Sequence, residues 1–189
     1  LRTARNWGMG DFSDLCSLIE QAASQGAGFI GLNPLHALYS ISPEHASPYS
    51  PSNRSMLNVL YIDPEAVSEF RVSEACQSWF SSAAVCEALA AARDTKQVDY
   101  SAVHRLKWHA FDLMFDSFVN THVALGTARS KKFLAFVEKG GEALQTHCLN
   151  FKSMAQSGRY YEVTDNGCRF NFLFIHDDSF LYSRPDQKM

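Results

Sequence analysis

The sequence contains no uninterrupted apolar run near the ~18 residues that a membrane-spanning helix needs, so it predicts no membrane span. It also has no basic run, because Lys131-Lys132 is only a pair and the formal net charge is −3. A general nucleic-acid binder is usually basic, so this balance argues against that class. We therefore expect neither nucleic acid nor a membrane as a partner.

Cysteine is present without a pairing pattern. The five cysteines are an odd number and are widely spread, at Cys16, Cys76, Cys86, Cys148 and Cys168. This spacing fits neither a disulfide framework nor a zinc motif. Free thiols are typical of a reducing compartment, and no signal-peptide pattern follows the opening residues. We therefore expect a cytoplasmic protein.

Familiar catalytic motifs are missing as well. The sequence has no phosphate-binding loop, dinucleotide fingerprint, nucleophile elbow or zinc-binding helix motif. Two glycines precede a helix in residues 7–11, but Trp7 among them favours packing over phosphate binding. Asp11 and Asp14 lie three residues apart at the start of that helix. The helix dipole favours acidic residues at this end, which explains the two aspartates better than the acid–base pair of a glycosidase does. No nucleophile, base and orienting group can be assembled, and we expect no cofactor.

Ordinary globular composition remains, with 46% hydrophobic and 20% charged residues among 189. This length predicts one domain, or a domain and part of another. Apolar spacing predicts a helix over 11–23, which Gly26 and Gly28 would end. Residues 29–34 (FIGLNP) then read as a short buried strand. A helix, a glycine break and a buried strand form half of a βαβ unit, which indicates a parallel α/β architecture.

The middle of the chain reads as helical. Helices are predicted over 73–92, with a break near residues 81–82, over 100–119, and over 131–137, where Gly140-Gly141 would end the last. Residues 57–62 read as extended. Beyond residue 149 the pattern becomes β-like, with a hairpin turn at 165–167.

The loop of residues 45–63 carries the strongest functional signal. Pro48 and Pro51 stiffen the backbone on either side of Tyr49, and hydroxyl side chains and Arg54 lie nearby. A flat ring on a stiff loop suits a polyhydroxylated ligand, although a surface turn rich in Ser and Pro fits the same spacing. The loop follows the predicted strand at 29–34, and parallel α/β folds build their sites beyond such strand ends.

Four motifs in order carry a family resemblance. They are NWGMGDFSDL at 6–15, GLNPLHALY at 31–39, SPYSPS at 47–52, and LN with YID within 57–63. Together they resemble the 4-α-glucanotransferases (amylomaltases or disproportionating enzymes, glycoside hydrolase family 77) over about residues 1–148. The resemblance implies an α/β fold, an incomplete (β/α)8 TIM-barrel portion with a largely helical insertion. It divides the chain into a barrel segment with the donor-site loop (1–64), a helical insertion (65–148) and an unassigned end (149–189), aberrant or divergent.

The family transfers α-1,4-glucan segments between maltodextrins by a retaining double displacement without a cofactor. The resemblance places its catalytic carboxylates C-terminal to every matched motif, so we expect no catalytic residue here and no turnover by the chain alone. Tyr49 resembles the family's stacking tyrosine at the donor sugar, and Ser47 its neighbour in that subsite. The expected partner is therefore a maltodextrin.

Two other functions remain open at this point. The chain could be a non-catalytic maltodextrin-binding module or remnant that uses Tyr49. It could also be a metal-dependent hydrolase built on His176, Asp177 and Asp178, which follow an apolar run. An incomplete barrel would expose apolar strand edges, so we also expect self-association, measurable by light scattering.

Overall fold

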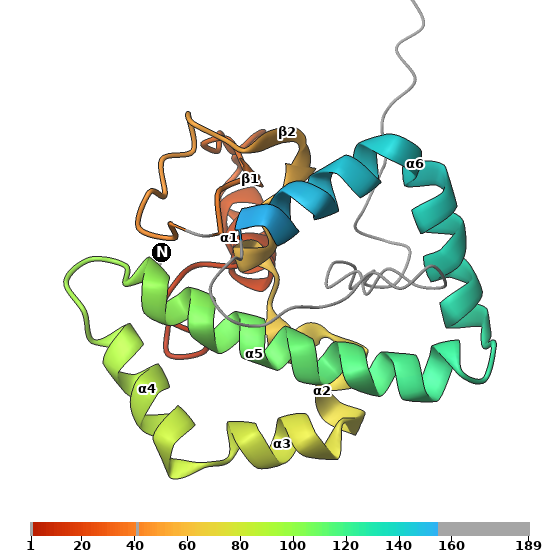
Figure 1. The fold of residues 1–189 in the computed structure, drawn as a ribbon. Helices are drawn as coiled ribbons and strands as arrows, with labels where there is room; N and C mark the ends of the chain where they lie inside the picture. Colours follow the sequence, from red (N-terminus) through yellow and green to blue (C-terminus); the bar gives the residue numbers. More distant parts are fainter. Residues whose placement is uncertain (1, 41, 155–189) are drawn as a thin grey trace, which may run out of the picture.

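Helix α5 (Tyr100–Phe118) crosses the middle of the molecule, and the other helices lie around it (Figure 1). This computed structural model describes residues 2–40 and 42–154. The other α-helices are α1 (Phe12–Ser24), α2 (Ser68–Val72), α3 (Glu74–Phe80), α4 (Ala83–Arg93) and α6 (Ala128–Met154). Short strands β1 (His36–Ala37) and β2 (Asn53–Leu57), the 3-10 turns η1 (Val59–Tyr61) and η2 (Pro64–Ala66), and the π-helical turn η3 (Val119–Val123) connect them.

Helix α5 forms where its sequence predicts, and its apolar stripe is the centre of the core. The Asp99 side chain caps it by accepting a hydrogen bond from the Ala102 N–H at 2.9 Å. Val103, Ala110 and Met114 on one face have no exposed surface. The main cluster around this face comprises Trp7, Val67, Phe70, Cys76, Val85, Leu89, Leu106, Ala110, Phe111 and Met114. The predicted helix and its buried face are confirmed.

The predicted break in the helical run 73–92 is also confirmed. The Ser73 hydroxyl caps α3 by accepting from the Cys76 N–H at 3.2 Å. Helix α3 ends at Phe80, and α4 begins after Ser82, whose hydroxyl donates back to the Trp79 carbonyl at 2.7 Å. Serine competes with the backbone for hydrogen bonds, so a serine pair readily separates two helices.

Helix α6 runs beyond the glycine pair at which the sequence predicts its end. Gly141 adopts a positive φ of 49° inside the element, so the helix kinks there and then resumes. Its second half reaches the β-hairpin, where Asn53 Nδ2 lies 3.3 Å from His147 Nδ1. Gly141 therefore kinks the helix without ending it. The residues beyond it continue the helix, and one of them, His147, contacts Asn53 of β2.

The predicted buried strand at 29–34 is wrong. In the described part of the chain the only sheet is the antiparallel pair β1–β2, with His36 opposite Leu57 and Ala37 opposite Asn53. Residues 29–34 have no regular structure, and the Phe29 side chain is 90% exposed. A strand needs a neighbour for its backbone groups, and no described residue provides one. The extended prediction for 57–62 is also wrong over Val59–Tyr61, which form turn η1.

Most of the described chain is therefore helical, with one small sheet, and the barrel portion expected for residues 1–64 stays a prediction. Helices occupy most of the region that we expected to be a helical insertion. The β-like segment after residue 154, Cys168, and the metal candidates His176, Asp177 and Asp178 lie outside the described residues. No described helix is long and apolar enough to cross a membrane.

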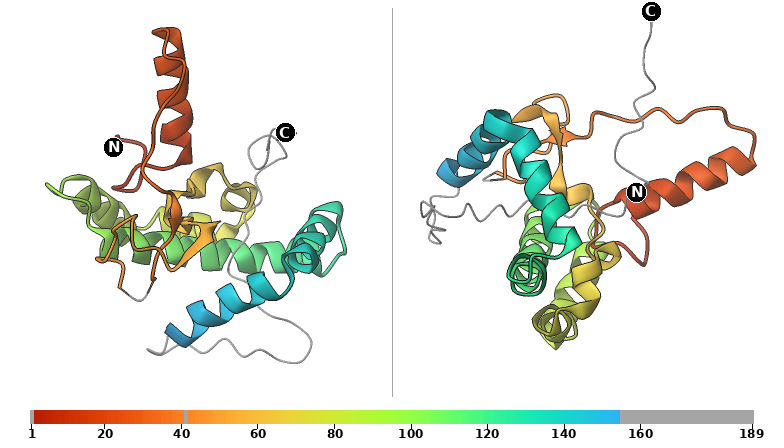
Figure 2. Two further views of the ribbon diagram at one scale, coloured as in Figure 1. Left: turned by 90° about the horizontal axis from the view of Figure 1, so that it is seen from above. Right: turned by 90° about the vertical axis from the view of Figure 1, so that its right-hand side faces the viewer.

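Helix α1 projects away from the other helices, and the chain returns alongside it toward β1 (Figure 2). Its predicted start is confirmed by reciprocal hydrogen bonds, in which Asp11 accepts from the Asp14 N–H and Asp14 accepts from the Asp11 N–H. The apolar face that the sequence predicts, however, is only partly covered. Leu18 and Ile19 are 40% and 44% exposed.

We expect Gly8→Ala to lower the free energy of unfolding by about 2 kcal/mol. Gly8 has a φ of 91°, which side-chain-bearing residues rarely adopt, and an added Cβ would lie 2.7 Å from the Ala92 carbonyl oxygen. Urea unfolding measures the loss. Gly28→Ala is the matched control, because an added Cβ there meets nothing within 4 Å. Equal effects of the two changes would contradict the close contact between Gly8 and α4.

Candidate functional site

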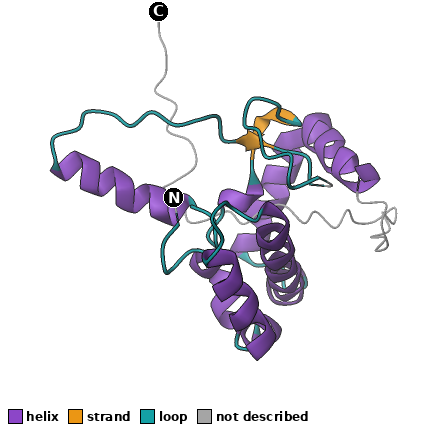
Figure 3. Cartoon of the chain, turned by 90° about the vertical axis from the view of Figure 1, so that its left-hand side faces the viewer, coloured by secondary structure: helices purple, strands orange, loops and turns teal. Residues whose placement is uncertain are grey.

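The loop between β1 and β2 carries the predicted donor-site residues and is closed at its base. The Ser52 N–H and hydroxyl both donate to the Ala37 carbonyl, at 2.9 and 3.1 Å. The Asn53 side chain accepts from the Ser55 N–H at 2.8 Å, which tightens the start of β2. The two ends of the loop are therefore held together, and its outer part is presented to solvent (Figure 3).

Tyr49 lies on the outer part of this loop with an accessible ring. Its side chain is 70% exposed, and its hydroxyl donates to Asn33 Oδ1 at 3.0 Å. A turn in which the Ser50 N–H donates to the Ser47 carbonyl at 3.2 Å precedes Pro51. Ser47 is exposed, two residues before the ring. The structure thus holds the hydroxyl edge of the Tyr49 ring in place while most of the side chain stays exposed.

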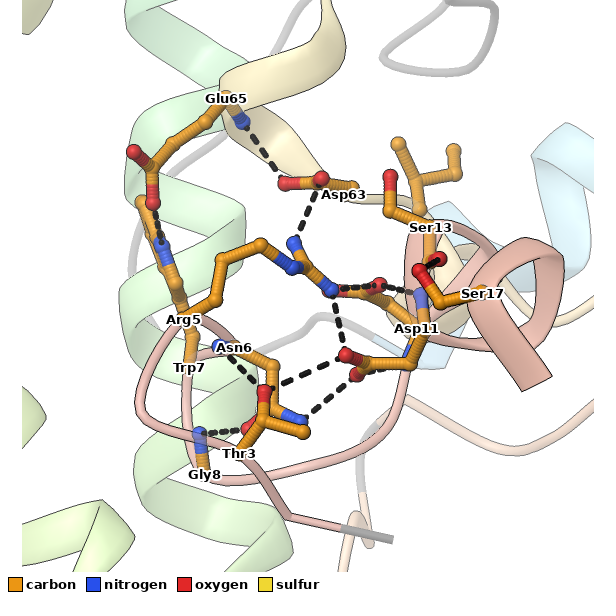
Figure 4. Close-up of polar contacts among 12 residues, drawn as sticks. Thr3, Arg5, Asn6, Trp7, Gly8, Asp11, Ser13, Ser17, Asp63 and Glu65 are labelled. Atoms are coloured by element: carbon orange, nitrogen blue, oxygen red, sulfur yellow. Dashed lines mark hydrogen bonds and ion pairs between the residues drawn. The ribbon is translucent and has the colours of Figure 1, made fainter. Parts of the chain in front are cut away.

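A second group of polar side chains, the Arg5 cluster, consists of Arg5, Asp11, Asp14 and Asp63 (Figure 4). Arg5 Nη2 lies 2.5 Å from Asp11 Oδ1 and 2.8 Å from Asp14 Oδ1. Arg5 Nη1 lies 2.6 Å from Asp63 Oδ2. One guanidinium therefore joins the start of α1 to the segment that follows β2.

The Arg5 cluster holds the Asp14 carboxylate in the ionised form. Burial alone would raise the pKa of Asp14, but hydrogen bonds from Asn6 and Arg5 outweigh it and lower the pKa below its usual value. Asn6 Nδ2 donates to Asp14 at 2.7 Å. Hydrogen bonds and charge from the aspartates also raise the pKa of Arg5, against the opposing effect of burial. A carboxylate kept ionised in this way is unsuited to act as a general acid.

The structure therefore confirms that Asp11 and Asp14 cap a helix, and it argues against a phosphate site at residues 7–11. Trp7 is fully buried, and the Gly8 N–H donates to Asn6 Oδ1 at 3.2 Å. The two aspartates place negative charge at the start of α1, where an anion would be repelled. Asp11 Oδ2 is buried without a hydrogen-bond partner among the described residues.

Lys107 supports the same segment from α5. Its ammonium donates to the Leu60 and Ile62 carbonyls at 2.6 and 2.8 Å, and it has no exposed surface. Burial lowers the pKa of Lys107 to about 8, although nearby Asp11 and Asp63 favour the charged form. The chain that follows β2 is therefore fixed by Lys107 at residues 60 and 62 and by Arg5 at Asp63.

We expect Lys107 to make stability rise with pH between about 8 and 10.5. The folded pKa lies below the ordinary value of 10.5, so the folded state releases this proton first. Within that window the unfolded state binds more protons than the folded state, so the free energy of unfolding increases with pH. Urea midpoints at pH 7.5, 9 and 10 measure the slope. Lys107→Met should remove it, because the other titrating groups are common to both proteins, and an unchanged slope would contradict the buried charge.

Other polar residues have structural partners. Glu69, 1% exposed on α2, accepts from Arg129 Nε at 2.6 Å and from Arg129 Nη2 at 2.8 Å, which ties α2 to α6. Sequence reasoning missed this pair.

His104 accepts a hydrogen bond from Trp108, and burial lowers the pKa of His104 to about 4. Within the described ranges no three His, Cys, Asp or Glu side chains are placed to hold a metal ion, and Cys16, Cys76 and Cys86 are free thiols.

Comparison with known proteins decides the family. The 4-alpha-glucanotransferase family model of glycoside hydrolase family 77 matches residues 1–165. The chain belongs to this family. A 4-alpha-glucanotransferase of Haemophilus influenzae is 42% identical over 144 residues, covering 76% of this chain. Relatives of the same description from Mycobacterium bovis and Mycobacterium tuberculosis are 38% identical over 76 residues, or 36% of this chain.

These comparisons confirm the resemblance that the four motifs carry and extend it. The family match ends at residue 165, beyond residue 148, where the motif-based resemblance ends. The matched region covers 21% of the Haemophilus 4-alpha-glucanotransferase and 10% of the Mycobacterium relatives. The chain therefore spans about a fifth or less of the length of these family members.

Proposed function

We propose that this member of the 4-alpha-glucanotransferase family binds the donor sugar during transfer of α-1,4-glucan segments between maltodextrins by a retaining mechanism. The single observation that supports this role is the placement of Tyr49, whose ring is exposed while its hydroxyl is held by Asn33. A sugar can lie on such a ring without first ordering the loop, which lowers the entropic cost of binding. The exposed Ser47 hydroxyl nearby completes the proposed subsite.

We assign the chemical step to none of the described residues. A retaining mechanism needs a nucleophile and an acid/base carboxyl roughly 5 Å apart across the scissile bond. The buried carboxylates of the described chain are already engaged, since Asp11, Asp14 and Asp63 share Arg5 and Glu69 binds Arg129. We therefore expect the purified chain to release no glucose from maltotriose. The free thiols of Cys16, Cys76 and Cys86 support a cytoplasmic location for this function.

We expect Tyr49→Ala to weaken maltoheptaose binding at least tenfold, because the stacking surface is removed. Isothermal titration calorimetry measures the affinity. Tyr49→Phe keeps the ring and loses only the hydrogen bond to Asn33, so its affinity should fall much less. Tyr39→Ala is the matched control, because Tyr39 lies on the same loop and is 41% exposed. Equal losses for Tyr49→Ala and Tyr39→Ala would contradict the assignment of the subsite to Tyr49.

A further inference from the structure

Asn33 lies in the irregular segment that runs from α1 back to β1 (Figure 2), yet its side chain contacts the loop between β1 and β2. Asn33 Oδ1 accepts a hydrogen bond from the Tyr49 hydroxyl at 3.0 Å, although the two residues are 16 apart in sequence. Both residues are exposed. The carboxamide of Asn33 is therefore placed at the edge of the ring that we propose to stack on the donor sugar.

The backbone beside Asn33 is held on the side that leads to the sheet. Pro34 follows Asn33 and disfavours the helical conformation for its backbone, so Asn33 is kept extended. The next carbonyl, that of Leu35, accepts from the Asn58 N–H at 2.9 Å. Strand β1 begins one residue later and pairs with β2. Asn33 is thus presented from a short, stiff connection, so its backbone needs little further ordering when a ligand binds.

The Asn33 carboxamide uses only its acceptor within the described chain. An asparagine side chain offers one carbonyl oxygen and two N–H donors. Asn33 Oδ1 binds the Tyr49 hydroxyl, but no described residue accepts a hydrogen bond from Asn33 Nδ2. Asn53, at the base of the same loop, differs, because its Oδ1 accepts from the Ser55 N–H at 2.8 Å and its Nδ2 lies 3.3 Å from His147 Nδ1. Asn53 therefore serves the fold, whereas Asn33 keeps its N–H donors available for a ligand.

We infer that Asn33 Nδ2 donates a hydrogen bond to a hydroxyl of the glucosyl unit that lies on the Tyr49 ring. The hydroxyls of a pyranose project from its rim, so a sugar stacked on Tyr49 brings them toward the ring edge where the carboxamide lies. A polar group in such a place fixes the orientation of the ligand and selects for its hydroxyls. The inference rests on the proposed donor-sugar site and adds to it a contact from a separate segment of the chain.

A double-mutant cycle of Asn33→Ala and Tyr49→Phe, measured by isothermal titration calorimetry with maltoheptaose, tests this contact. We expect Asn33→Ala to weaken binding about fivefold, which corresponds to the loss of one neutral hydrogen bond. In the Tyr49→Phe background the bond between the two side chains is already absent. The same change should still weaken binding there by about threefold or more. A loss below about 1.5-fold in that background would overturn the inference, because Asn33 would then act only through the Tyr49 hydroxyl.

The side-chain amide of Asn33 supplies a direct second readout. Nuclear magnetic resonance of the isotope-labelled chain detects this N–H pair, and Asn33→Ala assigns it by the loss of its signals. We expect these signals to shift on titration with maltoheptaose, both in the parent and in Tyr49→Phe. Signals that stay in place while the sugar saturates the chain would contradict a direct contact.

Asn120→Ala is the matched control, because Asn120 is exposed in turn η3, which follows the C-terminal end of α5. The loop reaches the other end of α5, where Glu44 and Tyr100 line one cavity. The control should leave the affinity unchanged, and every variant should keep the melting temperature of the parent, since the replaced side chains are exposed. Unchanged affinity in Tyr49→Ala would overturn the donor-sugar site together with this inference. A loss in Tyr49→Ala with none in Asn33→Ala would overturn the inference alone.

Discussion

Replacing Trp7 with alanine should lower the free energy of unfolding by about 4 kcal/mol. Trp7 has no exposed surface, and its ring centroid lies 5.4 Å from that of Phe80 and 6.2 Å from that of Phe70. Its indole N–H also donates to Glu65 at 3.0 Å, so the truncation removes a hydrogen bond as well as core volume. Trp7 connects the N-terminal segment with α2 and α3, and its loss should loosen all three.

Urea unfolding followed by far-ultraviolet circular dichroism measures this effect without relying on tryptophan fluorescence. Trp7→Phe should cost less, because a phenyl ring retains most of the packing and loses only the bond to Glu65. Leu125→Ala is the surface control and should change stability by at most ~0.5 kcal/mol. A loss below ~1 kcal/mol for Trp7→Ala would show that the N-terminal segment does not pack into the helical core as described.

Replacing Arg5 with alanine should destabilise the protein by about 3 kcal/mol at neutral pH. The change leaves Asp11, Asp14 and Asp63 close together without the guanidinium that bridges them. Removing one partner from a buried ionic group costs about 3–5 kcal/mol, and the 40% exposure of the Arg5 side chain places the expected value at the low end. The variant should also release α1 from the segment that follows β2.

The effect of Arg5→Ala should shrink in acid. The folded pKa of Asp14 lies below its unfolded value, so its ionised form stabilises the fold above the unfolded pKa, and this contribution is lost as pH falls through the folded pKa. Urea midpoints of parent and variant from pH 7 down to pH 3 measure the difference. Arg5→Lys, which keeps the charge but not the forked geometry, should fall between them. A difference that stays constant down to pH 3 would contradict the ionic role of the cluster.

Local sequence patterns predicted α1, α3, α4 and α5 because the determinants of these helices lie within a few residues of each helix. The apolar stripe of α5, the capping by Asp11 and Asp99, and the serine break before α4 all act over a few residues. The strand prediction for 29–34 failed because a strand depends on a distant partner. Its apolar residues have the pattern of a buried strand, yet the described chain supplies no strand for them to pair with.

The polar interior was harder to predict. Lys107 lies among the apolar positions of α5, one residue after Leu106, and this break in the stripe was the available signal. Its partners are backbone carbonyls of residues 60 and 62, which no side-chain motif reveals. Arg5 likewise gathers aspartates from two segments far apart in sequence. The loop carrying Tyr49 was identifiable because both prolines and the ring are neighbours in the chain.

The most direct test of the proposed donor-sugar site is nuclear magnetic resonance of the chain with labelled tyrosine rings, titrated with maltoheptaose. The sequence contains seven tyrosines, and Tyr49→Phe assigns the signal of Tyr49. We expect the ring signals of Tyr49 to shift progressively and saturate while those of Tyr39 stay in place. Ring shifts centred on another tyrosine, or no shift at saturating maltoheptaose, would contradict it.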